Sequence, residues 1–436
     1  MKLLDRIIKI LRAESKKVID NREKSKCKYT MEDIFLSAFS VFYFQNPSWL
    51  SSQRQMSTAS GRSNAESLFQ LEKIPTDNHI RDVLDGVDRK LLENIYNKIY
   101  EIVLKESHIL DEYEFGKRTL IIAIDGTYYY SSSKINCIHC QSKSDKYNGK
   151  VIYHHSAITP VIVHPRLNKV LPLFPEMIRN EDGKEKQDCE INASKRWLQK
   201  FELFKDYKII ILGDDLYSRS PFIEEVLAKG HSYIFVAKES SHKFMYEEIE
   251  FIKNIGKMDI KVDNRINKRE KEKREYKFLN DVDLVKDNSK STKTNWMNLE
   301  VTNKNNVTKY RNSFITDIRL NDNNIIELLK IARRRWKVEN ENNNVLKNNG
   351  YHLEHNFGHG KNGLSEFLFT LNILSFLIHE VCMYMNEDYK KLYKLLVTRE
   401  DFFKAINFFS MFIYVKSWEE MFQMMIKGHI EGLHIK

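Results

Sequence analysis

Hydrophobic residues recur at helical spacing in the first quarter of the chain. Apolar positions at three- and four-residue intervals predict helices within 31–43 and 83–104, and nothing before residue 118 alternates as a strand would. The polar stretch between them, 51–70, predicts a loop or a short pair of helices. We therefore expect residues 1–117 to be helical. A DNA-binding bundle and a purely structural docking region both fit, because no clear helix-turn-helix signature is present.

The pattern changes at residue 118 to short apolar runs that favour strands. Strands are predicted in TLIIAIDGTYYYSS (119–132), KVIYHHSAITPVIVHP (150–165) and VLPLF (170–174), followed by a helix near 188–204. YKIIILGDD (207–215) and SYIFVAK (232–238) predict further strands, with a helix between them that begins near Ser220–Pro221.

The next segment is rich in charge before the helical pattern returns. RINKREKEKREYK (265–277) is dense in both signs of charge, and 280–295 is polar enough for a loop. Strands are predicted at 298–303 and 312–318, and then a helix that Asn321–Asn324 would cap and that continues to about residue 348. The last stretch, 387–436, has amphipathic helical spacing.

This order of elements predicts an α/β fold. Three strands that form an antiparallel meander, followed by strand–helix units, match a ribonuclease-H-like mixed sheet with flanking helices. The predicted division is a helical N-terminal region with possible DNA binding, a catalytic core in two parts, an insertion and a helical C-terminal region: 1–117, 118–240 with 311–386, 241–310, and 387–436.

Composition narrows the class of protein. The chain has 436 residues, 42% of them hydrophobic, and a net charge of +10, which excludes wholesale disorder and weakly favours polyanionic partners. No apolar run of signal-peptide length opens the chain, and Leu364–Met385 carries too many polar residues for a membrane span. Five scattered cysteines fit a reducing compartment. We expect a cytoplasmic, nucleoid-associated protein that has no membrane contact.

Three acidic residues occupy positions where such a fold would place a site. Asp125 lies in the first predicted strand, Asp214 at the end of the fourth, and Glu339 on the late helix. Converging carboxylates repel one another unless divalent cations relieve the repulsion and activate water for attack on a phosphate. Mg²⁺ suits such a site, and Mn²⁺ is expected to substitute. Any one of these acids taken alone more often caps a helix or a turn.

Basic residues flank the third acid. Arg335, Glu339 and Lys347 lie on roughly one helical face, as a bound phosphodiester backbone would require, although an ordinary surface salt-bridge face has the same pattern. Some of the excess positive charge lies here, in Arg333, Arg334, Arg335, Lys337 and Lys347.

At these residues the chain resembles the DDE-type insertion-sequence transposases. IIAIDGTYYY resembles the strand of the first aspartate, and ILGDDLYSRSPF the second-aspartate motif, with Tyr217 as its aromatic residue. RRRWKVENENNNVLKNNGYHLEHNFGHG resembles the Arg-Trp-x-[Ile/Val]-Glu signature and its downstream Lys, which is the most specific match. Two further stretches, 74–85 and 175–198, also resemble segments of one subgroup.

The resemblance implies an enzyme that cuts and joins DNA. Asp125, Asp214 and Glu339 would hold the metals, and Arg334, Arg335, Trp336 and Lys347 would contact DNA. Water would cleave a phosphodiester at the element end, and the freed 3′-hydroxyl would attack target DNA. Double-stranded DNA is the expected partner, and pairing two ends requires at least a dimer in the complex. The block 241–310 would be a β-rich insertion found in many relatives.

The sequence also departs from the family pattern. Ala332 stands where a Tyr is common, and Lys347 lies eight rather than seven residues after Glu339, a difference that a one-residue helix bulge would reconcile. Asp215 and Glu341 are alternatives to Asp214 and Glu339.

Other residues suggest zinc or further DNA contacts. Cys137, His139 and Cys140, with His154, His155 and Cys189, include a Cys-x-x-Cys pair but lack a second pair at the usual spacing, which favours core cysteines. His352, His355 and His359 favour packing and phosphate contacts over a metal. The block Lys268–Arg274 fits either phosphate contacts or a solvated helix with internal ion pairs.

Two other functions fit the same sequence. One is a catalytically inactive, transposase-derived DNA-binding protein, which needs no metal. The other is a structure-specific nuclease of the same fold, which would hydrolyse DNA without joining it.

Overall fold

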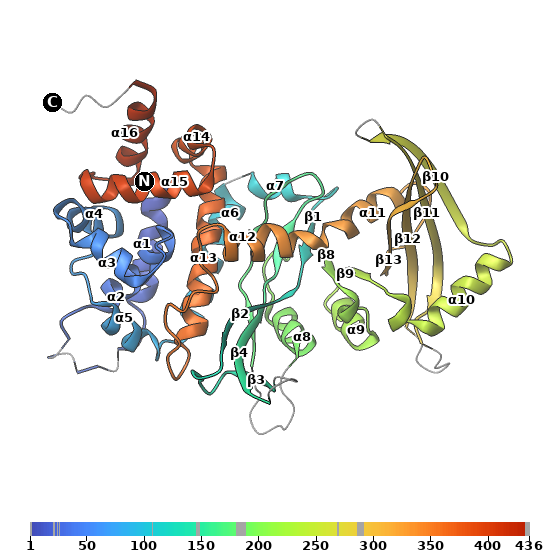
Figure 1. Ribbon diagram of the computed structural model, residues 1–436, viewed down its shortest axis with the longest axis horizontal. Coiled ribbons are helices and arrows are strands. Elements are labelled where there is room, and N and C mark those ends of the chain that lie inside the picture. The colour runs from blue at the N-terminus through green and yellow to red at the C-terminus, as the bar shows by residue number, and fades with distance from the viewer. Residues whose placement is uncertain are drawn as a thin grey trace.

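The computed structural model describes residues 2–431 apart from 21, 24, 26, 107, 145–148, 180–188, 268–269 and 286–291, and it leaves out the side chains of 265–271. Helices gather at one end of an elongated molecule, a mixed sheet occupies the middle, and long antiparallel strands form the other end (Figure 1). The chain is therefore mixed α/β, with helices flanking the sheet.

Helices from both ends of the chain pack into one unit. The N-terminal helices are α1 (Leu3–Ser15), α2 (Met31–Tyr43), α3 (Trp49–Ser57), α4 (Ala59–Phe69), α5 (Asp77–Leu84), α6 (Lys90–Glu106) and α7 (Ile109–Tyr113). The C-terminal ones are α13 (Leu364–Met385), α14 (Glu387–Leu396), α15 (Arg399–Phe412) and α16 (Trp418–Glu431). The Trp418 indole donates to the Leu68 carbonyl at 3.0 Å, and Asn64 Nδ2 donates to the Ser410 carbonyl at 2.7 Å. Amphipathic spacing gave each helix an apolar face, and these faces cover one another.

The most apolar helix is a core element. Leu364–Met385 is long and apolar enough to cross a membrane, but 89% of its apolar window is buried inside the protein. It packs against α2 and against the strand β6 (Leu171–Pro172). Every residue from Leu364 to Cys382 is buried, so this helix belongs to the core of the protein.

The described residues form a nine-stranded mixed sheet. Its first part has the order β6-β5-β1-β8-β9, built from β1 (Thr119–Ala123), β5 (Val161–Val163), β8 (Lys208–Gly213) and β9 (Ser232–Val236) with β6 at its edge. Strand β1 is antiparallel to β5 and parallel to β8, and β8 is parallel to β9. Strands β1 and β8 are buried on both faces, as their uninterrupted apolar runs predict.

A second sheet branches from this core. It has the order β2-β4-β3, with β7 beside β4, and comprises β2 (Gly126–Ser132), β3 (Gln141–Ser144), β4 (Val151–Ile158) and β7 (Glu176–Ile178). The stretch 119–132, for which strand structure was predicted, therefore forms two strands that belong to two different sheets. Asp125 lies in the junction between them rather than inside the first strand, which corrects the sequence prediction. The Thr159 amide donates to the Asp125 carbonyl at 3.0 Å, so the junction is held by a backbone hydrogen bond from outside either strand.

The charged segment forms strands. β10 (Asp259–Asn267), β11 (Glu270–Asp283), β12 (Lys293–Asn303) and β13 (Thr308–Thr316) extend the main sheet beyond β9. Residues 270–274 belong to strand β11, so the solvated-helix alternative is wrong for this part of the block Lys268–Arg274. Opposite charges pair across and along the strands: Lys277 Nζ lies 3.1 Å from Glu300 and 3.2 Å from Glu275. Lys268 and Arg269 lie outside the described residues, as does 286–291 within the polar stretch predicted as a loop.

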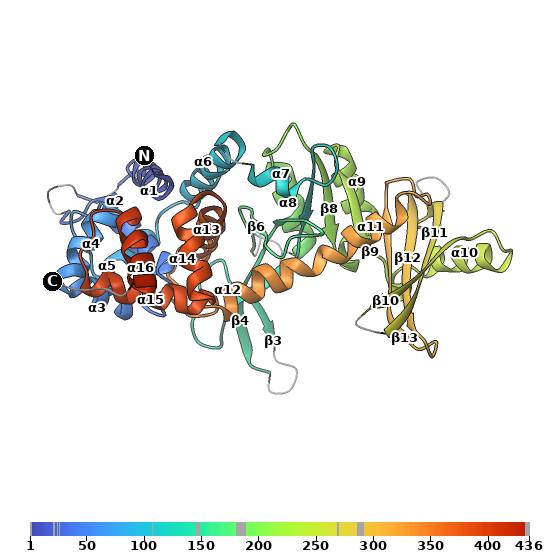
Figure 2. The same ribbon diagram turned by 90° about the horizontal axis from the view of Figure 1, so that it is seen from above.

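Helices cover the sheet on two sides. α8 (Glu190–Lys200) and α9 (Ser220–Ala228) lie on one side of β1, β8 and β9, and a long segment from α11 to α12 crosses the other side (Figure 2). α9 carries Pro221 in its first turn, as predicted, and α10 (Lys243–Asn254) lies against β11. The long segment comprises α11 (Ile325–Ala332), a 3₁₀ turn (Arg333–Trp336), a π-helical stretch (Val338–Asn343) and α12 (Asn344–Asn348).

Candidate active site

Two of the predicted acids lie at the ends of neighbouring parallel strands. β1 and β8 run in register, with Ala123 opposite Leu212, and the Ile124 amide donates to the Leu212 carbonyl at 2.9 Å. Asp125 follows Ala123 by two residues, and Asp214 follows Leu212 by two residues. Because carboxyl ends of parallel strands share one edge of a sheet, these side chains leave the sheet at adjacent points.

The third acid comes from the helical segment that crosses the sheet. Glu339 lies in the π-helical stretch Val338–Asn343 and is 48% exposed. A π turn inserts one residue into a helix, so the bulge expected from the late position of Lys347 is confirmed. The Thr159 hydroxyl donates to Asn343 Oδ1 at 2.9 Å, and Thr159 also holds the Asp125 carbonyl. Thr159 therefore fixes the π-helical stretch next to Asp125.

Arg335 contacts two of the acids with one atom. Its Nη1 lies 3.7 Å from Asp125 Oδ2 and 3.3 Å from Glu339 Oε1. The Arg335 side chain is only 21% exposed, and the Asp125 side chain is 15% exposed. A partly buried cation between two carboxylates lowers their mutual repulsion, so Arg335 is the local counter-charge in this state.

The electrostatics identify a fourth carboxylate that the sequence prediction missed. Burial and the neighbouring carboxylates Glu190, Glu339 and Asp214 together raise the pKa of Asp125 to about 7, although the Arg335 guanidinium opposes them. Burial and Asp214 also raise the pKa of Glu190. The site thus holds more negative charge than one guanidinium neutralises, an arrangement typical of a cation-binding site.

Glu190 is held in place by a buried tyrosine and a glycine. Tyr217 donates to Glu190 Oε1 at 2.7 Å, and the Gly126 amide donates to the same oxygen at 3.0 Å. A Cβ on Gly126 would lie 2.6 Å from Glu190 Oε2, and one on Gly213 would lie 2.6 Å from the Tyr217 ring. The glycines after the first strand and before Asp214 therefore leave room for this arrangement. The sequence offered only one signal for Glu190, its position in the stretch 175–198 that resembles the subgroup.

The structure separates the two alternative acids from the site. Asp215 accepts from the Lys238 amide at 2.6 Å and from the Ser241 hydroxyl at 2.5 Å, so it ties the loop after β9. Glu341 is half-buried, and its charged neighbours are Lys337 and Glu380 rather than Asp125. Asp214 and Glu339 are therefore the better candidates.

The residues near Glu339 that were expected to contact DNA differ in exposure and in ion pairing. Trp336 is 38% exposed, Lys347 Nζ pairs with Glu354 at 2.9 Å, and Arg334 is half-buried. Lys337 is buried and donates to the His164 carbonyl at 2.9 Å, which removes it from the basic face that the sequence pattern suggested. Lys347 contacts Glu354 and Arg335 contacts Glu339, so the predicted stripe is two separate ion pairs.

The donor chemistry fits a hard divalent cation. The side chains that act on Asp125 are carboxylates and a guanidinium, with no sulfur or imidazole among them, and oxygen-only sites suit Mg²⁺ or Mn²⁺. Among the described residues, however, the one group of possible ligands with all atoms within 4.8 Å of one another is a set of cysteines and histidines. The carboxylates of Asp125, Asp214 and Glu339 therefore do not form a group whose oxygen atoms all lie within 4.8 Å of one another. Arg335 lies between Asp125 and Glu339.

Comparison with known proteins adds no relative to this picture. No family model matches the chain, and no curated protein sequence is similar to it. The assignment of the site therefore rests on its residues and their geometry.

Proposed function

We propose that this chain is a metal-dependent DNA transposase of the DDE type. The observation that carries the proposal is the approach of Asp125, Asp214 and Glu339 from two adjacent strand ends and a crossing helix, with Arg335 between Asp125 and Glu339. The raised pKa of Asp125, which is about 7, supports a site that expects bound positive charge.

The sheet order supports a ribonuclease-H-like core. Three strands, β6, β5 and β1, form an antiparallel series, and β8 and β9 add in parallel on the other side of β1. In this reading β10–β13 are an insertion that continues the sheet from β9 before the Glu339 segment returns to the core. The order of the acids along the chain is the order that the resemblance requires.

The residues divide the chemistry among them. Asp125, Asp214 and Glu339 would hold the divalent ions, which supply an activated water or 3′-hydroxyl and neutralise charge on the attacked phosphate. Glu190 adds negative charge beside them and is oriented by Tyr217. Arg335 holds Asp125 and Glu339 and can contact a phosphate oxygen. Trp336, Arg334 and Lys347 would contact DNA around the helix. The partner is double-stranded DNA, with two copies of the chain in the complex.

The test uses duplex oligonucleotides that carry the inverted repeats flanking the reading frame, with Mg²⁺ or Mn²⁺. The wild-type chain should nick the end and join the freed 3′-hydroxyl to a second duplex. Asp125→Asn should bind the same duplex without cutting it, and Asp206→Asn, which changes an exposed aspartate, should cut normally. Binding without metal-dependent cutting would favour the inactive DNA-binding alternative. Cutting that never joins two duplexes would favour the nuclease.

A further inference from the structure

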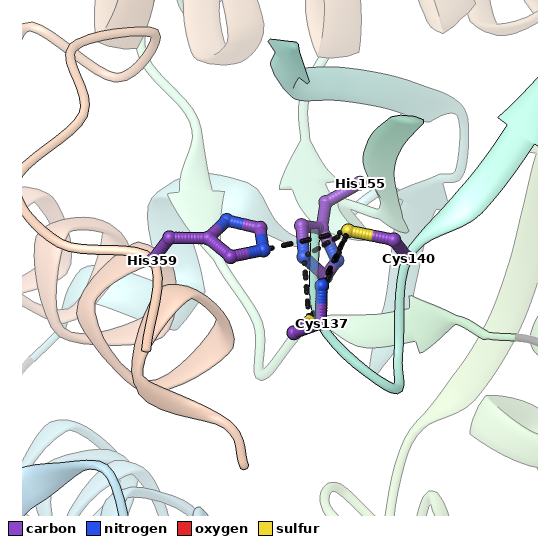
Figure 3. Close-up of side chains that lie close together, drawn as sticks. All are labelled: Cys137, Cys140, His155 and His359. Atoms are coloured by element: carbon purple, nitrogen blue, oxygen red, sulfur yellow. Dashed lines mark hydrogen bonds between the residues drawn. The ribbon is translucent and has the colours of Figure 1, made fainter. Parts of the chain in front are cut away.

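Two cysteines and two histidines meet outside the acidic site. Cys137 and Cys140 come from the segment between β2 and β3, His155 from β4, and His359 from the segment between α12 and α13 (Figure 3). The sulfurs lie 3.9 Å apart, His155 Nε2 lies 3.4 Å from each of them, and His359 Nε2 lies 3.4 Å from Cys140 Sγ. All four ligand atoms lie within 4.8 Å of one another.

These distances match the edges of a metal tetrahedron. Zinc binds thiolate sulfur at about 2.3 Å and imidazole nitrogen at about 2.0–2.1 Å, which places tetrahedral ligands about 3.8 Å apart for two sulfurs and about 3.5 Å apart for sulfur and nitrogen. The observed 3.9 Å and 3.4 Å agree with both values. A disulfide would require the sulfurs at about 2.05 Å, and neither Cys137 nor Cys140 is in a disulfide.

The surroundings favour a closed site. Cys140, His155 and His359 are 4%, 2% and 6% exposed, and Cys137 is half-buried. Aromatic rings support both imidazoles: Tyr129 stacks on His155 with ring centres 5.6 Å apart, and the Tyr130 ring centre lies 4.3 Å from that of His359. Four protein ligands complete a tetrahedral coordination and leave no position for a substrate, so such a site is structural.

We propose that Cys137, Cys140, His155 and His359 bind one structural zinc ion. Soft thiolates with imidazoles select zinc over Mg²⁺, whose ligands are oxygens. His154, Cys189, His352 and His355, which the sequence pattern also raised, are not in the group. The second ligand pair was missing from the local sequence because His359 comes from 359 − 137 = 222 residues further along.

The ion would join two parts of the molecule. The β2-β3-β4 sheet extends from Asp125, and His359 follows the segment that carries Glu339, so zinc would fix the sheet to that segment. His139 already contacts the Asn362 carbonyl at 2.6 Å across the same junction. Cross-linking residues so distant in sequence stabilises the folded state strongly. The inference does not rest on the proposed function, because zinc binding is measured without DNA.

The experiment measures metal in the full-length chain purified without chelators. Elemental analysis should find about one zinc per chain. Cys140→Ser and His359→Gln should lose it. The matched controls Cys27→Ser, outside the group, and His355→Gln, exposed in the same segment as His359, should keep it. Removal of zinc by a chelator should lower Tm, and added Zn²⁺ should restore it.

Wild-type protein provides a second readout that does not depend on variants folding. Replacement of the metal by Co²⁺ should give the visible absorption of tetrahedral thiolate coordination. A folded wild-type chain that holds no zinc and takes up neither Zn²⁺ nor Co²⁺ would overturn the proposal. So would a Cys137–Cys140 disulfide found by mass spectrometry in the folded protein, or zinc retained in both ligand variants.

Discussion

The Thr159 hydroxyl donates to Asn343 Oδ1 at 2.9 Å, which ties the connection between β4 and β5 to the π-helical stretch that carries Glu339. Thr159 is 2% exposed, and its amide also holds the Asp125 carbonyl at 3.0 Å. One buried residue thus sets the position of two of the proposed metal ligands, although it contacts neither carboxylate.

Thr159→Val should slow DNA cleavage while leaving DNA affinity nearly unchanged. Loss of a buried hydrogen bond costs roughly 1–2 kcal/mol of stability and frees the π-helical stretch to shift. Thr159→Ser keeps the hydroxyl and should cleave at the wild-type rate. A role that depended only on the volume of the side chain would not predict this result. Cleavage rates and binding curves on element-end duplexes separate the two effects. Equal rates for Thr159→Val and wild type would contradict a positioning role.

Glu339→Gln and Glu341→Gln form a matched pair on one helical segment. Glu339 contacts Arg335, whereas Glu341 lies near Lys337 and Glu380. Loss of a metal-ligating carboxylate removes several kcal/mol of transition-state stabilisation, so Glu339→Gln should cleave about a hundredfold more slowly or worse. Glu341→Gln should cleave within about threefold of wild type, because the lost charge acts elsewhere. The reverse ranking would reassign the third acid to Glu341.

Asp125 should make the metal-free protein less stable as pH rises. Its pKa is about 7 in the folded chain and about 4 when unfolded, so its contribution is present below pH 4 and is lost as pH rises through 7. Asp125→Asn lacks this titration and should exceed wild type by roughly 2–4 kcal/mol at pH 8 in a chelating buffer. Denaturant unfolding between pH 4 and 8 measures the difference. The free energy of unfolding of Asp206→Asn should depend on pH as that of wild type does. A difference between Asp125→Asn and wild type that stays constant from pH 4 to 8 would exclude the effect.

Arg335→Gln should move the pH-dependent loss of stability caused by Asp125 to higher pH. The guanidinium lowers the pKa of Asp125, so its removal raises that pKa further and destabilises the ionised site. Charge-assisted contacts are worth about 1.5–3 kcal/mol, and we expect cleavage to fall by roughly tenfold to a hundredfold. Arg333→Gln is the control, because Arg333 is exposed and lies over the Tyr310 ring at 4.6 Å. Equal pH profiles for the two variants would show that Arg335 does not act on Asp125.

Gly126→Ala should displace Glu190. The added Cβ would meet Glu190 Oε2 at 2.6 Å, closer than real contacts, so the carboxylate and its bond from Tyr217 must shift. We expect a loss of roughly 1–3 kcal/mol in stability, together with slower cleavage. Gly86→Ala is the control, because a Cβ there meets nothing within 4 Å. Thermal unfolding and cleavage rates compare the two, and matching behaviour would mean that Glu190 tolerates displacement.

The elements of the core were largely predictable from the sequence. The apolar runs at 207–215 and 232–238 lie at strands β8 and β9, and the helical spacing within 31–43 coincides with α2. Local periodicity determines such elements because each buries a face whose spacing is written in the chain. The dense charge at 270–277 concealed strand β11 from the sequence pattern, because its charged side chains form ion pairs such as that between Lys277 and Glu300 of β12.

What the sequence determined by itself is the set of acids in their order and the helical or extended character of their segments. It even indicated the helix bulge, through the eight-residue step from Glu339 to Lys347. Only the tertiary structure directed Asp215 to the loop after β9, placed Glu190 beside Asp125, and brought His359 to Cys137, Cys140 and His155. The reason is physical: periodicity is local, whereas the direction of a side chain and the partners of a buried charge depend on residues that packing brings from elsewhere in the chain.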